Sequence, residues 1–297
     1  MRLSQIIGLF GLLLLTTMCT EGQFLEPQEV DNIPSKKADT IVQYGEDELQ
    51  FAELRLPKGE GPFPVIIIVH GGCWYSPYAD LKNTSAIADA LRDEGYATYN
   101  VEYRRFDNKG GGWPNTILDV GKAADYLKVI APKFNLDLNK VISYGHSAGG
   151  HLAFWLGTRN QRIVGDDLYL ENPLSIKGIL GVGSINDLVE FEKIDTSTCG
   201  EVVVVKLMGG KVDAQPKRYQ EASPIMNLPL GIPQILITGE SDKIVPSYLG
   251  DAYTKAAKNS GDKVQHIIVS NAAHHEYNAP SKPPYKHIVQ SVKELMK

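Results

Sequence analysis

The 297-residue sequence lacks several features that mark other classes of protein. It has no HExxH motif, no paired CxxC and no Asp-rich loop, so the common metal sites have no basis in it. It also lacks GxGxxG, the usual nicotinamide-binding fingerprint. The net charge is −5 and Lys and Arg form no dense cluster, which argues against a nucleic-acid partner. We therefore expect neither a metal nor a cofactor.

Long apolar runs are scarce as well. The clearest is residues 6–15, preceded by Arg2, and its ten residues are too few to span a bilayer as a permanent helix. The pattern is typical of a secretory leader, so we predict a signal peptide over residues 1–20 and export to the periplasm, the membrane surface or the medium. A buried apolar helix is disfavoured because the polar residues 21–38 follow, which we interpret as a linker.

Only three cysteines are present: Cys19, Cys73 and Cys199. The run ending at Cys19 loosely resembles a bacterial lipoprotein box, although Met18 replaces its usual small residue. A membrane tether through a lipidated Cys19 and a freely soluble form therefore both stay open. Cys73 and Cys199 are either a disulfide of an oxidising compartment or two buried thiols. The oligomeric state cannot be inferred.

The remainder of the chain is typical of one globular domain, which we place at residues 39–297. Apolar residues make up 43% and charged residues 22%, ordinary values for a folded protein. The run VIIIV at 65–69 is typical of a strand buried on both faces of a parallel sheet. Strand-like runs then alternate with helix-like ones, which predicts an α/β fold with a mostly parallel sheet and helices on both faces.

Strands are predicted at 40–44, 49–56, 65–69, 97–103, 140–144, 176–182, 233–238 and 264–269. Helices are predicted at 80–94, 115–130, 148–159, 246–260 and 285–296. The long excursion over residues 186–230 lies between two strands, and we interpret it as a small partial lid.

The clearest chemical motif is GHSAG at residues 145–149, which fits GxSxG. It comes directly after a predicted strand and directly before a predicted helix. In that context the serine lies on a tight strand-to-helix turn and its hydroxyl is exposed at the edge of the sheet. We predict that Ser147 is a nucleophile.

A second motif, HGGCW at residues 70–74, follows the strand VIIIV. Successive glycines let the backbone approach a ligand and direct N–H groups toward it. We expect the N–H groups of Gly71 and Gly72, with that of Ala148, to form an oxyanion hole. His70 is better interpreted as a hydrogen-bonding group that fixes this loop.

These motifs, with EYR at 102–104 and ASPI at 222–225, resemble the α/β-hydrolase branch of kynurenine-formamidase-like and acetyl/feruloyl-esterase-like proteins, related to hormone-sensitive-lipase-like esterases. The resemblance covers residues 40–297 and implies the α/β-hydrolase fold. It also implies a catalytic His with a bulky residue and then an acidic one after it, which favours His274 and leaves His275 as the alternative. The stretch GESDKIVP at 239–246 matches the family's GxxDxxVP, which implies Asp242 as the orienting acid.

Alternatives remain at this stage. Asp187 follows a predicted strand and could supply the acid, whereas Glu240 is more simply a solvated charge. Trp74, Tyr75, Trp113 and the histidine not used in catalysis, His275, could line the substrate pocket; core packing is the equal alternative for the aromatic residues.

The expected function is hydrolysis of a small-molecule carboxylic ester, with a short acyl, carbohydrate or aryl group, by a Ser-His-Asp triad through an acyl-enzyme. One rival is an aryl formamidase that cleaves an amide of the N-formyl kynurenine type. A rival from another class is a non-catalytic exported binding module.

Overall fold

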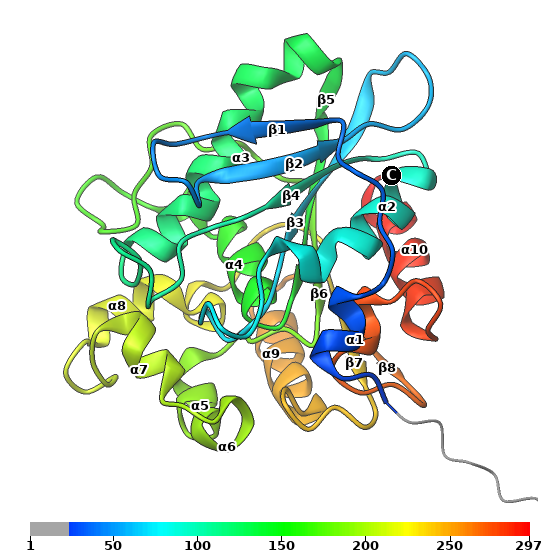
Figure 1. Cartoon of the computed structure of the whole chain (residues 1–297). Helices are drawn as coiled ribbons and strands as arrows, with labels where there is room; N and C mark the ends of the chain where they lie inside the picture. Colours follow the sequence, from blue (N-terminus) through cyan, green and yellow to red (C-terminus); the bar gives the residue numbers. More distant parts are fainter. Residues whose placement is uncertain (1–23) are drawn as a thin grey trace, which may run out of the picture.

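The β-branched run at 65–69 lies at the centre of an eight-stranded sheet (Figure 1), in a computed structural model that describes residues 24–297. The strand order is β1-β2-β4-β3-β5-β6-β7-β8, with β1 and β2 antiparallel and the remainder parallel. The strands are β1 (Thr40–Gln43), β2 (Phe51–Arg55), β3 (Phe63–Val69), β4 (Ala97–Val101), β5 (Leu136–His146), β6 (Gly178–Val182), β7 (Gln234–Gly239) and β8 (Val264–Val269).

Side chains of β3 alternate between two apolar cores, as the period of two in a strand requires. Val65, Ile67 and Val69 belong to one core, and Ile66 and Ile68 belong to the other. All five side chains are fully buried. The continuous apolar run is thus explained by a strand covered on both faces, and the predicted α/β-hydrolase architecture is confirmed.

Helices cover both faces of the sheet (Figure 1). Side chains of α2 (Ser85–Asp93) and α10 (Pro284–Leu295) pack into one core. Side chains of α3 (Asn115–Phe134), α4 (Ala148–Leu156) and α9 (Ser247–Asn259) pack into the other. Within residues 24–297 there are also four short 3-10 helices: η1 (Leu81–Thr84), η2 (Arg159–Gln161), η3 (Pro224–Asn227) and η4 (Glu276–Asn278).

The excursion predicted as a partial lid is a group of short helices (Figure 1). They are α5 (Leu188–Glu192), α6 (Asp195–Cys199), α7 (Val203–Met208) and α8 (Pro216–Ala222). Several of their apolar residues, among them Phe191 and Leu207, are fully buried in the larger core. The group is therefore packed onto the domain.

The prediction of a linker over residues 21–38 is corrected in part, because this segment contains a helix with a buried residue. Residues 27–31 form helix α1 (Pro27–Asp31), and its Val30 is only 2% exposed. Further along, the backbone N–H of Lys36 donates to the carboxylate of Asp89. Polarity suggested a linker, and the buried Val30 and this hydrogen bond hold part of that segment on the surface of the domain. The predicted leader and Cys19 lie outside the described residues.

None of the helices within residues 24–297 is both long enough and apolar enough to cross a membrane.

A buried ion pair beyond β4 predicts a large change in stability. Asp119 is fully buried and its two oxygens accept Nε and Nη2 of Arg104, each at 2.7 Å. We expect Arg104→Ala to lower the free energy of unfolding by about 3 kcal/mol, because the carboxylate stays buried without its charged partner. Urea denaturation measures this. Lys206→Ala, which breaks an exposed pair with Glu201, should cost under about 1 kcal/mol, and equal losses in the two variants would contradict the argument.

Candidate active site

Ser147 occupies the turn between the end of β5 and the start of α4. Its backbone has φ 55° and ψ −122°, in the region that residues with a side chain rarely adopt. The turn is held because the N–H of Ser147 donates to the carbonyl of Val182 on β6, at 3.0 Å. This is the strand-to-helix turn that the GxSxG motif predicts.

The last glycine of the motif is required by packing. A Cβ atom at Gly149 would lie 2.2 Å from the carbonyl oxygen of Val69 and 2.3 Å from that of His70. The first turn of α4 therefore crosses directly over the end of β3. This contact brings the loop after β3 alongside Ser147.

The loop after β3 carries the predicted oxyanion glycines. A Cβ on Gly71 would lie 3.0 Å from the Cβ of Ser147, so the backbone there passes directly beside the nucleophile. Gly72 has φ 95° and packs against Ala79, where a Cβ would lie 2.8 Å from that side chain. Within residues 24–297 the N–H groups of Gly72 and Ala148 donate to no other protein group.

Glu102 holds the same loop in place through hydrogen bonds. Its Oε1 lies 3.1 Å from Nε2 of His70 and accepts from Arg105 at 2.6 Å, and its Oε2 accepts from the N–H of Leu81 at 3.0 Å. Tyr103 adds a ring stacked on His70 and a hydroxyl that donates to the His70 carbonyl. His70 therefore orients the loop, as predicted from the sequence.

His274 is hydrogen-bonded to Asp242 and lines the same cavity as Ser147. Nδ1 of His274 lies 2.8 Å from Oδ2 of Asp242, and the same oxygen accepts the hydroxyl of Tyr277 at 2.9 Å. Oδ1 accepts the N–H groups of Ile244 and Val245 at 3.0 and 2.8 Å. Burial alone would raise the pKa of Asp242, but His274 and these donors lower it below its ordinary value. The carboxylate is thus held ionised next to the imidazole.

The predicted alternatives for base and acid lie in different surroundings. His274 contacts Asp242, whereas His275 lines the cavity beside it. Asp187 instead caps α5, accepting the N–H groups of Val189 and Glu190. Glu240 is exposed, as expected for a solvated charge.

Two neighbouring histidines are held neutral. Burial, and then the adjacent His274, lower the pKa of His275 to about 3. Burial is also the main cause that lowers the pKa of His146 well below its ordinary value. His146 accepts from Asn278 at Nδ1, so Nε2 carries the proton and donates to the backbone carbonyl of His274 at 2.9 Å.

Ser147, His274 and His275 line one cavity of about 380 Å³. None of its lining residues within 24–297 is Asp, Glu, Lys or Arg. The other lining residues are Pro27, Gln28, Gly72, Cys73, Pro77, Tyr78, Ala79, Asn83, His146, Thr198, Cys199, Gly200 and Ile244. A neutral ligand would therefore meet no uncompensated charge in this cavity.

The three aromatic residues predicted as pocket residues do not line this cavity, which is a correction. Trp74 is fully buried and packs edge-on against His151 and Phe191 in the core. Tyr75 stacks on Phe106, and Trp113 lies under the guanidinium of Arg218. Their position in the sequence near the loop did not determine which way their side chains point. The fourth residue predicted for the pocket, His275, does line the cavity.

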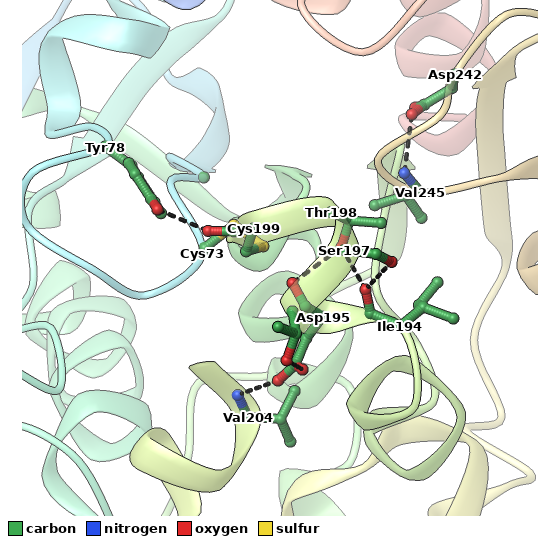
Figure 2. Close-up of a disulfide and its surroundings, with 12 residues drawn as sticks. Cys73, Tyr78, Ile194, Asp195, Ser197, Thr198, Cys199, Val204, Asp242 and Val245 are labelled. Carbon is green, nitrogen blue, oxygen red and sulfur yellow. Dashed lines mark hydrogen bonds between the residues drawn. A yellow bond between two sulfur atoms is a disulfide. The ribbon is translucent and has the colours of Figure 1, made fainter. Parts of the chain in front are cut away.

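A disulfide between Cys73 and Cys199 joins two walls of the cavity (Figure 2). It ties the loop after β3 to the end of α6, across 126 residues of sequence. Beside it the hydroxyl of Tyr78 donates to the carbonyl of Cys199 at 2.6 Å. At the start of α6, buried Asp195 accepts the N–H of Val204 at 3.0 Å and so couples α6 to α7. Of the two alternatives from the sequence, the disulfide is the one present.

Sequence reasoning missed three residues that hold the histidine loop: Tyr277, Glu276 and Asn278. All three are buried and follow His274 within four residues. The available signal was that a Glu, a Tyr and an Asn stand together in a loop expected to lie against the sheet edge, where polar groups need partners.

The disulfide predicts a loss of stability on reduction. Removing a cross-link across so long a loop should lower the free energy of unfolding by about 2–4 kcal/mol. Urea denaturation of the Cys73→Ala/Cys199→Ala variant measures this, with wild type in dithiothreitol as the matched sample. A reduced wild-type sample whose unfolding midpoint is unchanged would show that the bond between α6 and the loop after β3 does not stabilise the domain.

Glu102 predicts a stability that depends on pH. Burial alone would raise its pKa, but His70, Arg105 and the Leu81 N–H together lower it from 4.5 to about 2. Because the folded-state pKa is the lower one, the carboxylate contributes roughly 3 kcal/mol above pH ~4.5, and this is lost as pH falls toward ~2. The difference in unfolding free energy between wild type and Glu102→Gln should shrink across that window. If the difference in unfolding free energy between the two proteins does not change with pH, Glu102 does not have the lowered pKa on which this prediction rests.

Comparisons with known proteins give the family. The BD-FAE family model matches residues 53–256. Esterase LipC of Mycobacterium tuberculosis is 25% identical over 238 residues, covering 78% of this chain and 58% of that protein. The chain therefore spans less than two thirds of that relative's length.

Two solved structures are similar in fold. A carbohydrate esterase from gut microbiota matches with a TM-score of 0.74 at 23% identity, over 89% of this chain and 98% of that one. Esterase B from Lactobacillus rhamnosis, with a tributyrin phosphonate inhibitor, matches with a TM-score of 0.73 at 18% identity, over 90% of each chain. Because the family model covers more than half of the sequence, the chain belongs to the BD-FAE family of hormone-sensitive-lipase-like α/β-hydrolases.

Proposed function

We propose that this protein is a serine esterase that hydrolyses neutral carboxylic esters through an acyl-enzyme. The observation that carries the proposal is the His274–Asp242 pair at 2.8 Å, of which His274 lines the same cavity as a serine on a strained turn. An imidazole oriented by a buried carboxylate is the base that a serine hydroxyl needs to become a nucleophile.

In the proposed reaction, Oγ of Ser147 attacks the ester carbonyl while its proton passes to Nε2 of His274. The C–O bond to the alcohol then breaks, and the alcohol leaves with that proton. Water repeats the attack on the acyl-enzyme, returns a proton to Ser147 through His274 and releases the acid. Asp242 keeps the imidazole in the required tautomer and stabilises its charged form.

The negative oxygen of each tetrahedral intermediate requires donors. We assign this role to the N–H groups of Gly71, Gly72 and Ala148, in line with the close approach of the glycine loop to Ser147. Each well-placed donor is worth roughly 10²–10³ in rate. Because His146 and His275 stay neutral, they add no competing positive charge at the site.

The cavity supports a neutral substrate, since no charged side chain of the described residues faces it. The carbohydrate esterase of similar fold makes an acylated sugar a candidate, with the alcohol being a sugar hydroxyl. Short acyl esters of other alcohols are consistent with the same lining.

The proposal predicts that Ser147→Ala reduces ester turnover by several orders of magnitude, roughly 10⁶-fold by analogy with other triads. The measurement is kcat/KM on p-nitrophenyl esters from acetate to octanoate, with Ser197→Ala, an exposed serine on α6, as the matched control. Labelling by a fluorophosphonate, mapped by mass spectrometry, should fall on Ser147 alone.

Other outcomes would redirect the proposal. Labelling at Ser147 with turnover of N-formyl kynurenine but not of esters would favour the formamidase. A folded sample that is neither labelled nor active would favour the non-catalytic binding module.

A further inference from the structure

A short segment at the N-terminal side of the described chain lies over the cavity. We name residues 24–32 the strap. Pro27 and Gln28 of the strap line the same cavity as Ser147. The strap precedes residue 53, where the match to the family model begins, so the family assignment says nothing about it.

The strap is attached to the loop that carries His274. The N–H of Leu25 donates to Oε1 of Glu276 at 2.5 Å, across 251 residues of sequence. Oε2 of the same carboxylate accepts the N–H of Ala273 at 2.8 Å. Glu276 is only 1% exposed. Because Ala273 precedes His274 and Glu276 follows it, this one buried carboxylate connects the strap to the loop on either side of His274. In Figure 1, α1 (dark blue) lies beside the orange segment that follows β8.

A second attachment runs through three amide and imidazole side chains. Nδ2 of Asn83 donates to Asp31 at 2.9 Å, and Oδ1 of Asn83 accepts from Asn278 at 2.8 Å. Asn278 also donates to His146, which in turn donates to the His274 carbonyl. Asn83, Asn278 and His146 are all buried. The strap is therefore hydrogen-bonded at both of its ends to the groups that position the base.

A second wall of the cavity is held by contacts of a different kind. There the wall is formed by Thr198, Cys199 and Gly200, which the disulfide holds to the glycine loop. Pro27 and Gln28 of the strap line the same cavity, and the strap is held by hydrogen bonds and the buried Val30. No described residue of the strap belongs to either apolar core.

We propose that the strap is a specificity-determining wall of the active site, in which Pro27 and Gln28 limit the size of the substrate group beside Ser147. Glu276 and Asn83 hold the wall in place and so act as positioning residues. The proposal rests on the proposed function, because the limit concerns the ester that Ser147 would attack. With the strap docked, the enzyme selects small esters; with the strap released, the cavity opens on that side to longer ones.

Paired variants of the full chain can release or retain the strap. Leu25→Pro removes the N–H that Glu276 accepts, and Asp31→Ala removes the acceptor of Asn83. The retaining pair, Leu25→Ala with Asp31→Asn, keeps an N–H and a side-chain oxygen at the same places. Limited proteolysis followed by mass spectrometry reports whether residues 24–38 are exposed, and thermal unfolding reports whether the domain is intact. Lys37→Ala, an exposed residue outside the strap, is the neutral control.

The decisive quantity is the ratio of kcat/KM for p-nitrophenyl octanoate to that for the acetate. We expect the releasing pair to raise this ratio about tenfold or more, since a few methylenes in a pocket change selectivity by that order. The retaining pair should stay protected from protease, and Lys37→Ala should keep the wild-type ratio. An unchanged ratio in a releasing variant whose strap is cleaved would overturn the proposal. So would a releasing variant whose strap stays protected, because the two hydrogen bonds would then not be what holds it.

Failure of the esterase proposal can be told apart from failure of the wall. The rates at which a short-chain and a long-chain alkyl fluorophosphonate label Ser147 give the same size ratio without any ester turnover. If both reagents label wild type but no ester is hydrolysed, the esterase proposal fails and the labelling ratio still decides the wall. If neither reagent labels folded wild type, both proposals are wrong.

Discussion

The backbone of Ser147 is the constraint on which the rest of this site depends. A residue with a side chain at φ 55° is unfavourable and is kept there only by what surrounds it. The strand before it, the helix after it and the hydrogen bond from its N–H to the carbonyl of Val182 hold it in that conformation. This turn fixes the hydroxyl of Ser147 at the carboxyl edge of the sheet, where the loops after β3, β7 and β8 can reach it.

Buried carboxylates organise those loops. Glu102 holds the glycine loop through His70 and Arg105, Asp242 holds His274, and Glu276 joins Ala273 to the strap. Each carboxylate accepts several N–H or O–H groups, which is how a protein keeps a charge away from water without losing its stabilisation. Buried carboxylates thus hold the loops after β3, β7 and β8 in place near Ser147.

The sequence was informative where a local pattern has only one structural solution. The β-branched run at 65–69 predicted the buried strand of the sheet, and the glycines after it predicted the loop beside Ser147. The GxSxG motif between a strand and a helix predicted the turn itself. It was uninformative about Trp74, Tyr75 and Trp113, because an aromatic residue beside a site packs equally well into a core, and only the long-range contacts of His151, Phe106 and Arg218 decide which. The disulfide and the docking of α1 depend on pairs more than 100 residues apart, which no local pattern reports.

Those two long-range ties bound the cavity in physically different ways. A covalent bond joins the glycine loop to α6, so that wall moves only if the bond is reduced or the lid unfolds. On the other side, hydrogen bonds from Leu25 and Asn83 hold α1, and a helix of five residues has little stability of its own. The two walls are therefore held by different means, one by a covalent bond and the other by hydrogen bonds. On the proposal above, a substrate too large for the closed cavity is excluded by Pro27 and Gln28 unless the strap is released, and that release would leave the disulfide between the glycine loop and α6 in place.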